Sequence, residues 1–510
     1  MSAAATTAAV AAPPQRHRVD PRVEAAVRAA KPFQPRYLVP LLRILVFHLY
    51  FVPTSLLAIP LIALRCIVPA LRPNPRWSFL TALSILNVRR AMRSMIRFGF
   101  QPIQPREGGW RDTRGSIAAL LNVLNYSGPG GSVTHPKLAA DAAKKVARGV
   151  DKVWFDPPPL DALTDVLSVR TQGAGRGLAV QSTHYAGPPL LDPAFAKTRS
   201  RAFWFMHRPG VLPPSAQAAS KSATTTTTKT PPRERPVILY FHGGAGVTFS
   251  AADLFMGQCL ASNLAKSSGA DVFSVDYLLA PHGPFPVPLM QGVAAYIYLH
   301  RTLGYRTDQI YIGGDSYGAW LTLCLERYLR TYAHLVLDDP ESHASGAESP
   351  SFVAGLVLLS PHIAHDGDHF ASRQKYVATD IIDLSYGEWG ADAQRITPRH
   401  RATNPLPLSD PWYTHSNKPS DELARLPPVY IANGDNEVLR DEGIYFAQLL
   451  RQAKGGLAES DPEVVLESEP DMPHDYFTLD TERARARKVY GRIGKWIRGI
   501  TEGNGSGYRL

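Results

Sequence analysis

The pentapeptide Gly314-Asp315-Ser316-Tyr317-Gly318 is the segment of this sequence best suited to carry out chemistry. It follows the strand-like segment QIYIGG and precedes the helix-like segment AWLTLCLERYL. A sharp turn from strand to helix leaves no room for side chains at the two glycines, and it presents the serine hydroxyl above a sheet. The bare pattern often arises by chance, but this context predicts that Ser316 is a nucleophile and that Gly314 and Gly318 support its turn.

A second glycine-rich turn, Phe241-His242-Gly243-Gly244-Ala245-Gly246, follows the apolar run 237–241. Nucleophilic attack on a carbonyl places negative charge on its oxygen, and backbone N–H groups in such a turn can donate to that oxygen without obstruction by side chains. We therefore predict an oxyanion hole formed by the N–H groups of Gly243, Gly244 and Tyr317. For His242 we expect a structural role in shaping the loop.

A serine hydroxyl needs a base to take its proton, and the base needs a carboxylate that holds its tautomer. After a turn of this kind the chain order is serine, then acid, then histidine. His474 lies in the segment Met472-Pro-His-Asp-Tyr-Phe477, after the strand-like run 464–466 and before a terminal helix that begins near Thr481, and we predict that it is the base. Within 433–442, both Asp435 and Glu437 are candidates for the acid.

These motifs resemble the hormone-sensitive-lipase-like branch of the α/β-hydrolases, which includes arylacetamide deacetylases and fungal steryl acetyl hydrolases. The resemblance covers residues 236–500 and extends to VDYLLAP at 275–281, to Phe285-Pro286 and to LPPVYI at 426–431. It implies an α/β-hydrolase fold and a serine hydrolase without a metal or organic cofactor. The substrate it implies is a carboxylic ester, such as a short-chain acyl ester of a lipophilic alcohol (for example a steryl acetate), or an arylacetamide.

The sequence departs from the family pattern at two places. Ala245 replaces the third glycine of the family's H-G-G-G, a change that preserves backbone donation. Aligning the family's D-x-L-x-D-E with residues 437–442 places Glu437 at the acid position, so we prefer Glu437 and keep Asp435 as the alternative. Asp441 and Glu442 are expected in the first turn of the next helix, where negative charge suits the helix dipole.

The remaining sequence predicts an α/β architecture. Apolar runs at 237–241, 272–275, 310–313, 353–359 and 429–432 alternate with helix-like stretches, which is typical of a mostly parallel sheet flanked by helices. We expect a catalytic domain at 236–500, preceded by a low-complexity linker at 213–235 and by a helical cap region at 72–212, with helical patterns at 78–98 and 137–150. Residues 1–36 and 501–510 are expected to be tails.

Residues 44–64 contain no Asp, Glu, Lys or Arg, and at a helical rise they could cross a hydrocarbon core of roughly 30 Å. We interpret 37–71 as a membrane anchor that contacts lipid through 44–64. Pro53 and Pro60 would kink the helix, so either a spanning helix or a re-entrant hairpin fits. Basic residues flank both sides almost equally, which leaves the orientation open. The expected location is a membrane, that of the endoplasmic reticulum.

Composition and charge limit the kinds of partner and function that we expect for this protein. The formal net charge is +11, but the basic residues are spread along the chain without a nucleic-acid-binding motif, so we expect no nucleic-acid partner. Three cysteines form neither a disulfide framework nor a metal set, and no obligatory protein partner is inferred. Two other functions stay open: acyl transfer by the same triad, and a catalytically inactive ligand-binding or membrane scaffold protein.

Overall fold

A computed structural model of the chain describes residues 40–98, 152–169, 190–208, 213–214, 235–252, 254–337, 352–401 and 404–505. Its centre is a sheet with the strand order β1-β2-β4-β3-β5-β6-β7-β8, in which neighbouring strands from β4 to β8 run parallel. The strands are β1 Lys152–Phe155, β2 Ser200–Phe205, β3 Val237–Phe241, β4 Asp271–Val275, β5 Ile310–Asp315, β6 Gly355–Leu359, β7 Val429–Gly434 and β8 Val464–Glu469. The expected fold class is confirmed.

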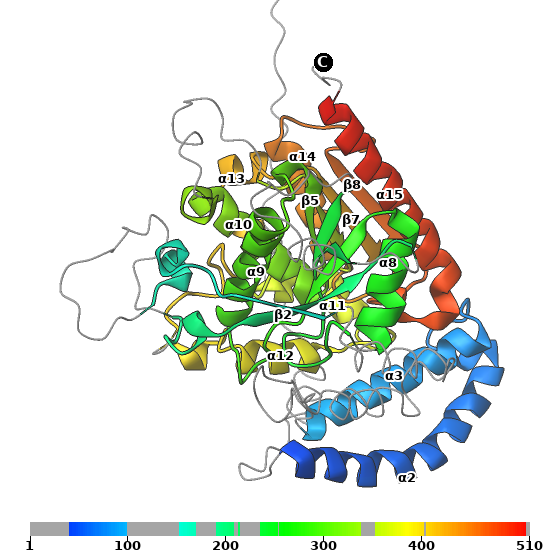
Figure 1. Cartoon of the computed structure of the whole chain (residues 1–510). Helices are drawn as coiled ribbons and strands as arrows, with labels where there is room; N and C mark the ends of the chain where they lie inside the picture. The colour runs from blue at the N-terminus through cyan, green and yellow to red at the C-terminus, as the bar shows by residue number, and fades with distance from the viewer. Residues whose placement is uncertain are drawn as a thin grey trace, which may run out of the picture.

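Helices cover both faces of this sheet (Figure 1). On one face lie α9 Val287–Ile297, α10 Tyr317–Leu337 and α14 Arg440–Ala453, and on the other α8 Ser262–Ser268 and α15 Arg483–Gly505. Strand β3 shows why: Leu239 packs into the first hydrophobic core, whereas Ile238 and Tyr240 pack into the second. A strand that is buried on both faces must be apolar throughout, and this accounts for its continuous apolar sequence.

The region before the linker differs from our expectation. Strands β1 and β2 pair antiparallel with each other, and β2 pairs antiparallel with β4. The described part of 72–212, where we expected a helical cap region, therefore adds two strands to the edge of the catalytic sheet as well as helix α3. Helix α12 Leu384–Ala393, which lies between β6 and β7 in the chain, packs beside the glycine-rich turn.

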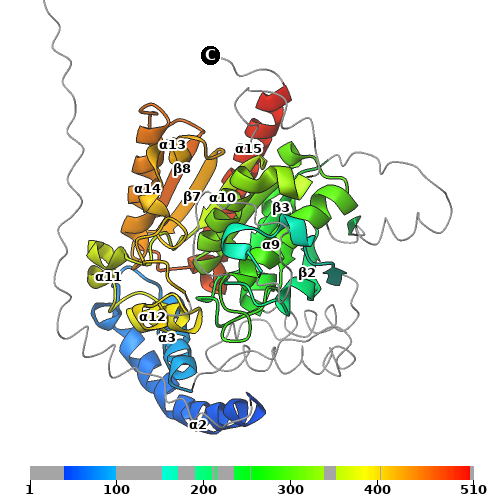
Figure 2. The ribbon, with the colours of Figure 1, turned by 90° about the vertical axis from the view of Figure 1, so that its left-hand side faces the viewer.

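Two long helices near the N-terminus form a hairpin below the sheet (Figures 1 and 2). Helix α2 spans Pro40–Ile67 and helix α3 spans Phe79–Phe98, and the two pack along each other. Helix α3 agrees with the helical pattern predicted at 78–98. Within the described chain, the segment Leu45–Ile67 is long and apolar enough to cross a membrane.

Other expected segments fall largely outside the described residues. The tail 1–36 and the helical pattern at 137–150 lie there entirely, as does most of the linker at 213–235. Residues 501–505, expected to begin a tail, belong instead to helix α15. The short helices α11 Ala371–Lys375 and α13 Ser420–Ala424 complete the part of the chain that follows β6.

Candidate active site

Ser316 occupies the sharp turn between β5 and α10. Its φ of 52° lies in the left-handed region, which side-chain-bearing residues rarely adopt, and its N–H donates to the carbonyl of Leu359 at the end of β6. The flanking glycines are required by close packing. A Cβ at Gly318 would lie 1.9 Å from the carbonyl oxygen of Phe241, and a Cβ at Gly314 would lie 2.3 Å from the carbonyl carbon of Gly318.

His474 lies next to this serine, as the sequence predicted. Its Nε2 is 2.9 Å from Ser316 Oγ, a normal hydrogen-bond distance, and both side chains are buried. The loop after β8 delivers the histidine, and its backbone N–H donates to Asp380 Oδ1 at 2.7 Å. This geometry is suited to the transfer of a proton from the serine hydroxyl to the imidazole.

Of the two candidate acids, the structure brings Glu437 to the histidine. Glu437 Oε2 lies 3.7 Å from His474 Nδ1 and accepts a hydrogen bond of 2.7 Å from Ser360 Oγ. Asp435 instead pairs with Arg440 at 2.7 Å, and its side chain is 45% exposed. Burial raises the pKa of Glu437, and the opposing effects of His474 and Ser360 do not cancel this shift.

The separation between Glu437 and His474 is longer than a hydrogen bond. Among the described residues, neither His474 Nδ1 nor Glu437 Oε1 has a hydrogen-bond partner. Catalytic hydrogen bonds of this kind often tighten only when substrate binds.

A second carboxylate, which we did not identify from the sequence, approaches the histidine from the other side. Asp475 Oδ2 lies 3.2 Å from His474 Nε2, the nitrogen that also faces Ser316. Burial would lower the pKa of His474, but the charges and hydrogen bonds of Asp475 and Glu437 outweigh burial and raise it well above its usual value. The imidazolium form of this histidine is therefore strongly stabilised.

Asp380 is another buried acid that sequence reasoning missed. Besides the N–H of His474, its carboxylate accepts the N–H of Val438 at 2.7 Å, so it joins the histidine loop to the loop that carries Glu437. Burial raises the pKa of Asp380 to about 7 against the opposing effect of His474. No motif marks this aspartate, because its partners lie far away in sequence.

One of the predicted oxyanion donors is corrected by the structure. The N–H of Gly243 donates to Asp315 Oδ2 at 2.9 Å, so it already has a carboxyl partner inside the protein. Asp315 also accepts from Tyr240 Oη and is fully buried. Among the described residues, the structure gives no protein acceptor for the N–H groups of Gly244, Ala245 and Tyr317.

The glycine-rich turn itself is held by close contacts. Gly244 has a φ of +103°, and a Cβ there would meet the carbonyl oxygen of Thr248 at 2.5 Å, so this position requires glycine. His242 is buried with its ring stacked on Tyr277 at 4.4 Å, and its Nδ1 lies 2.8 Å from the carbonyl oxygen of Gly243. Burial lowers the pKa of His242 to about 4, which fits a neutral structural residue.

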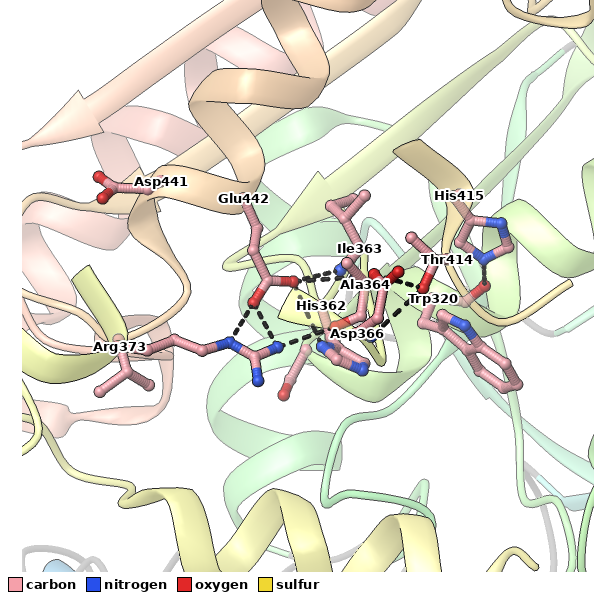
Figure 3. Close-up of polar contacts among 12 residues, drawn as sticks. Trp320, His362, Ile363, Ala364, Asp366, Arg373, Thr414, His415, Asp441 and Glu442 are labelled. Carbon is pink, nitrogen blue, oxygen red and sulfur yellow. Dashed lines mark hydrogen bonds and ion pairs between the residues drawn. The ribbon is translucent and has the colours of Figure 1, made fainter. Parts of the chain in front are cut away.

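The loop after β6, which follows the nucleophile's neighbouring strand, is held in place by Glu442, as Figure 3 shows. Glu442 Oε2 accepts the N–H groups of Ile363 at 2.9 Å and Ala364 at 3.0 Å, while its Oε1 accepts from Arg373 Nη2 at 2.7 Å. The N–H of His362 donates to the carbonyl oxygen of Ser316 at 3.2 Å. Glu442 does lie in the first turn of α14, as expected, but it is fully buried and fixes this loop.

A cavity of about 210 Å³ lies at the start of α9, between Phe285, Leu190 and Arg395. None of Ser316, Glu437 and His474 lines it. Among the described residues, no group of three or more histidines, cysteines or acidic residues is placed to hold a metal ion.

Comparison with known proteins shows similarity to α/β hydrolases and esterases. Residues 238–478 match the model of a family described as having an α/β hydrolase fold. An acetyl-hydrolase of Streptomyces hygroscopicus is 27% identical over 52% of this chain and 76% of its own length. An esterase of Mycobacterium tuberculosis is 29% identical over 43% and 61%, and a lipase of a Moraxella strain is 26% identical over 43% and 51%.

The matches thus span between 51% and 76% of the length of these relatives. Among solved structures, an esterase of Pyrobaculum calidifontis is similar with a TM-score of 0.44, at 22% identity, over 59% of this chain and 81% of that one. The family model covers strands β4 to β8 and all but the first residue of β3, together with Ser316 and His474. The sheet order and this match agree with the α/β-hydrolase fold that the sequence predicted.

Proposed function

We propose that this protein is a carboxylic ester hydrolase in which Ser316 is the nucleophile and His474 the general base. The observation that carries the proposal is the 2.9 Å contact between Ser316 Oγ and His474 Nε2, with Ser316 in a left-handed backbone conformation at the turn between β5 and α10. His474 takes the hydroxyl proton as Ser316 Oγ attacks the ester carbonyl, and the C–O bond to the alcohol breaks as His474 returns the proton to the leaving oxygen. Water, deprotonated by the same histidine, then releases the acid from the serine.

Glu437 serves as the acid in this proposal. It is the carboxylate on the Nδ1 side of His474, at 3.7 Å, where it can orient the ring and stabilise the imidazolium. For the oxyanion we assign the N–H groups of Gly244, Ala245 and Tyr317, because the N–H of Gly243 is held by Asp315. Backbone donors in a rigid turn need no reorganisation when charge develops on the oxygen.

For the substrate we propose short-chain acyl esters of lipophilic alcohols, such as steryl acetates. An acetyl-hydrolase among the relatives supports a short acyl group. The exposed apolar surface of α2 supports an alcohol that partitions into lipid. The endoplasmic-reticulum location remains a prediction, which fluorescence microscopy of the tagged full-length chain would test.

A fluorophosphonate probe tests the mechanism directly, because it labels only an activated serine. We expect the wild type to be labelled and to hydrolyse p-nitrophenyl acetate. Ser316→Ala should abolish both, whereas Ser420→Ala, at an exposed serine on α13, should abolish neither. A folded wild type that is neither labelled nor active would contradict the proposal and favour a ligand-binding protein.

A further inference from the structure

The outer face of α2 is an apolar surface with no covering element in the described chain. Its exposed side chains recur every three or four residues, which places them on one side of the helix. They include Leu45, Leu49, Val52, Leu56, Leu57, Leu61, Leu64 and Ile67, each between 40% and 73% exposed. Soluble proteins rarely leave so continuous an apolar surface in water. We call this surface the α2 stripe.

The opposite face of α2 packs against α3 through Phe47, Phe51 and Ser55, which are all buried. Arg90 of α3 donates to Ser55 Oγ at 2.6 Å and lies 4.7 Å from the centre of the Phe51 ring. A polar arginine thus contacts the middle of α2. If α2 crossed a bilayer, this charge would lie near the membrane centre, where it is costly.

Helix α3 is in turn fixed to the catalytic domain. Arg89 donates to the carbonyl oxygen of Asp380 at 2.6 Å, Arg93 pairs with Asp383 at 2.8 Å, and Thr81 Oγ1 donates to Glu482 at 2.6 Å. Helix α2 packs against α3, which lies between α2 and the catalytic domain (Figures 1 and 2). Helix α2 cannot leave α3 to span a hydrocarbon core without breaking the contacts between the two helices.

The charge of the hairpin fits an anionic surface. Residues 40–98 contain no aspartate or glutamate, and Arg65 and Arg76 of this segment are exposed. Arg65 lies in the last turn of α2 and Arg72 follows five residues after the helix, and their side chains donate to the carbonyls of Leu71 and Cys66, respectively. An apolar face beside basic residues is the pattern of helices that lie in the membrane interface and bind anionic lipids.

We propose that the α2–α3 hairpin docks in the plane of an anionic phospholipid membrane, with the α2 stripe among the upper acyl chains, and that α2 does not cross the bilayer. Both chain segments that flank the hairpin then lie on the same side of the membrane. In this proposal residues 44–64 contact lipid through the α2 stripe and do not span the membrane. The hairpin that they form with α3 lies in the membrane interface and does not enter the bilayer as a re-entrant hairpin would.

The hairpin also reaches the candidate active site. Arg89 holds the backbone of Asp380, whose carboxylate accepts the N–H of His474. Helix α12 packs on α3, and its Gly390 lies directly on Ala245 of the glycine-rich turn. Docking would thus bring α12 and the glycine-rich turn close to the lipid surface, so that a lipophilic ester enters from the membrane. This second part rests on the proposed esterase function.

Depth-dependent quenching tests the in-plane geometry. The three native cysteines are buried, so a fluorescent label can be placed on Leu49→Cys, Leu56→Cys or Leu64→Cys of the full-length protein. The probes are vesicles of phosphatidylcholine and phosphatidylserine with bromine near either the carbonyl or the methyl end of the acyl chains. We expect all three labels to be quenched by the shallow bromines, with efficiencies within about twofold of one another.

Deep quenching at position 56 with shallow quenching at 49 and 64 would overturn the proposal, because a spanning helix gives that pattern. Flotation gives a second measurement: Leu56→Glu with Leu57→Glu should reduce binding to these vesicles by about tenfold or more. The control Leu160→Glu, at an exposed leucine in another part of the protein, should bind as the wild type does. The proposal would also be overturned if the wild-type protein did not float with the vesicles and instead formed a dimer through the α2 stripe.

Two substrates distinguish the failure of this inference from the failure of the esterase proposal. The Leu56→Glu, Leu57→Glu variant should hydrolyse water-soluble p-nitrophenyl acetate at the wild-type rate and lose activity on cholesteryl acetate in vesicles. Equal activity on both substrates would contradict entry from the membrane. Wild type that is inactive on both would contradict the esterase function, while the quenching pattern would still decide the docking geometry.

Discussion

Replacing Asp475 by asparagine tests whether this carboxylate raises the pKa of the candidate base, His474. In the structure His474 lies between two carboxylates, with Glu437 on the Nδ1 side at 3.7 Å and Asp475 on the Nε2 side at 3.2 Å. Asp475→Asn keeps the shape of the side chain and removes its charge. Two further buried acids, Asp380 and Asp315, also act on His474 and stay unchanged in this variant.

The expected magnitude follows from the distance. An opposite charge this close shifts a pKa by about 1 to 3 units, and Asp475 is only 11% exposed, so solvent screens it little. Because other carboxylates remain, we expect the pKa of His474 to fall by about one to two units. The base must be neutral to act, so the acid limb of kcat/KM should move to lower pH by the same amount.

The measurement is the pH profile of kcat/KM on a water-soluble ester whose own ionisation does not change over the range. On the alkaline plateau we expect activity to fall by about tenfold or less, because the imidazolium formed in the transition state loses a partner. Asp435→Asn is the matched control, since Asp435 pairs with Arg440 and should leave the acid limb in place. An acid limb that stays at its wild-type position in Asp475→Asn, or moves to higher pH, would refute this reasoning.

Three further outcomes are expected. Glu437→Gln should lower kcat by about 10²- to 10⁴-fold with little change in KM, and Asp435→Asn should not, as steady-state kinetics would show. Burial would raise the pKa of Glu442, but Arg373 and His362 outweigh it and lower the value to about 2. Ionised Glu442 therefore stabilises the fold above its unfolded pKa of 4.5, and this is lost as the pH falls towards 2. Denaturant unfolding should show Glu442→Gln destabilised by about 3 kcal/mol at pH 7, with a smaller difference at low pH; an equal difference at both would contradict the ion-pair account. Gly390→Ala puts a Cβ 2.4 Å from the carbonyl oxygen of Ala245 and should impair ester hydrolysis, whereas Gly387→Ala on the same helix meets nothing within 4 Å and should not.

Much of the site was predictable from the sequence because its signals are local. The turn at Ser316 needs glycines on both sides for steric reasons that involve only neighbouring residues and the preceding strand. His474 could be identified by its position between a strand and the terminal helix. The strand β3 was predicted with its observed bounds, because burial on both faces leaves a continuous apolar run.

Contacts between segments far apart in the sequence were decided only by the tertiary structure. Asp435 and Glu437 are two residues apart, so composition could not show which one faces His474, and only the path of the loop after β7 separates them. The N–H of Gly243 was predicted as an oxyanion donor because nothing local reveals that Asp315, 72 residues away, accepts it.

For the α2–α3 hairpin, too, the sequence predicted a local property and the tertiary structure decided the contacts. Hydropathy alone identified the apolar helix at 44–64, because that property is carried by each residue. Whether the helix stands apart or lies against other elements depends on Arg90 contacting Ser55 and on Arg89 reaching Asp380. An arginine has many acceptors available to it, and only the folded chain selects one.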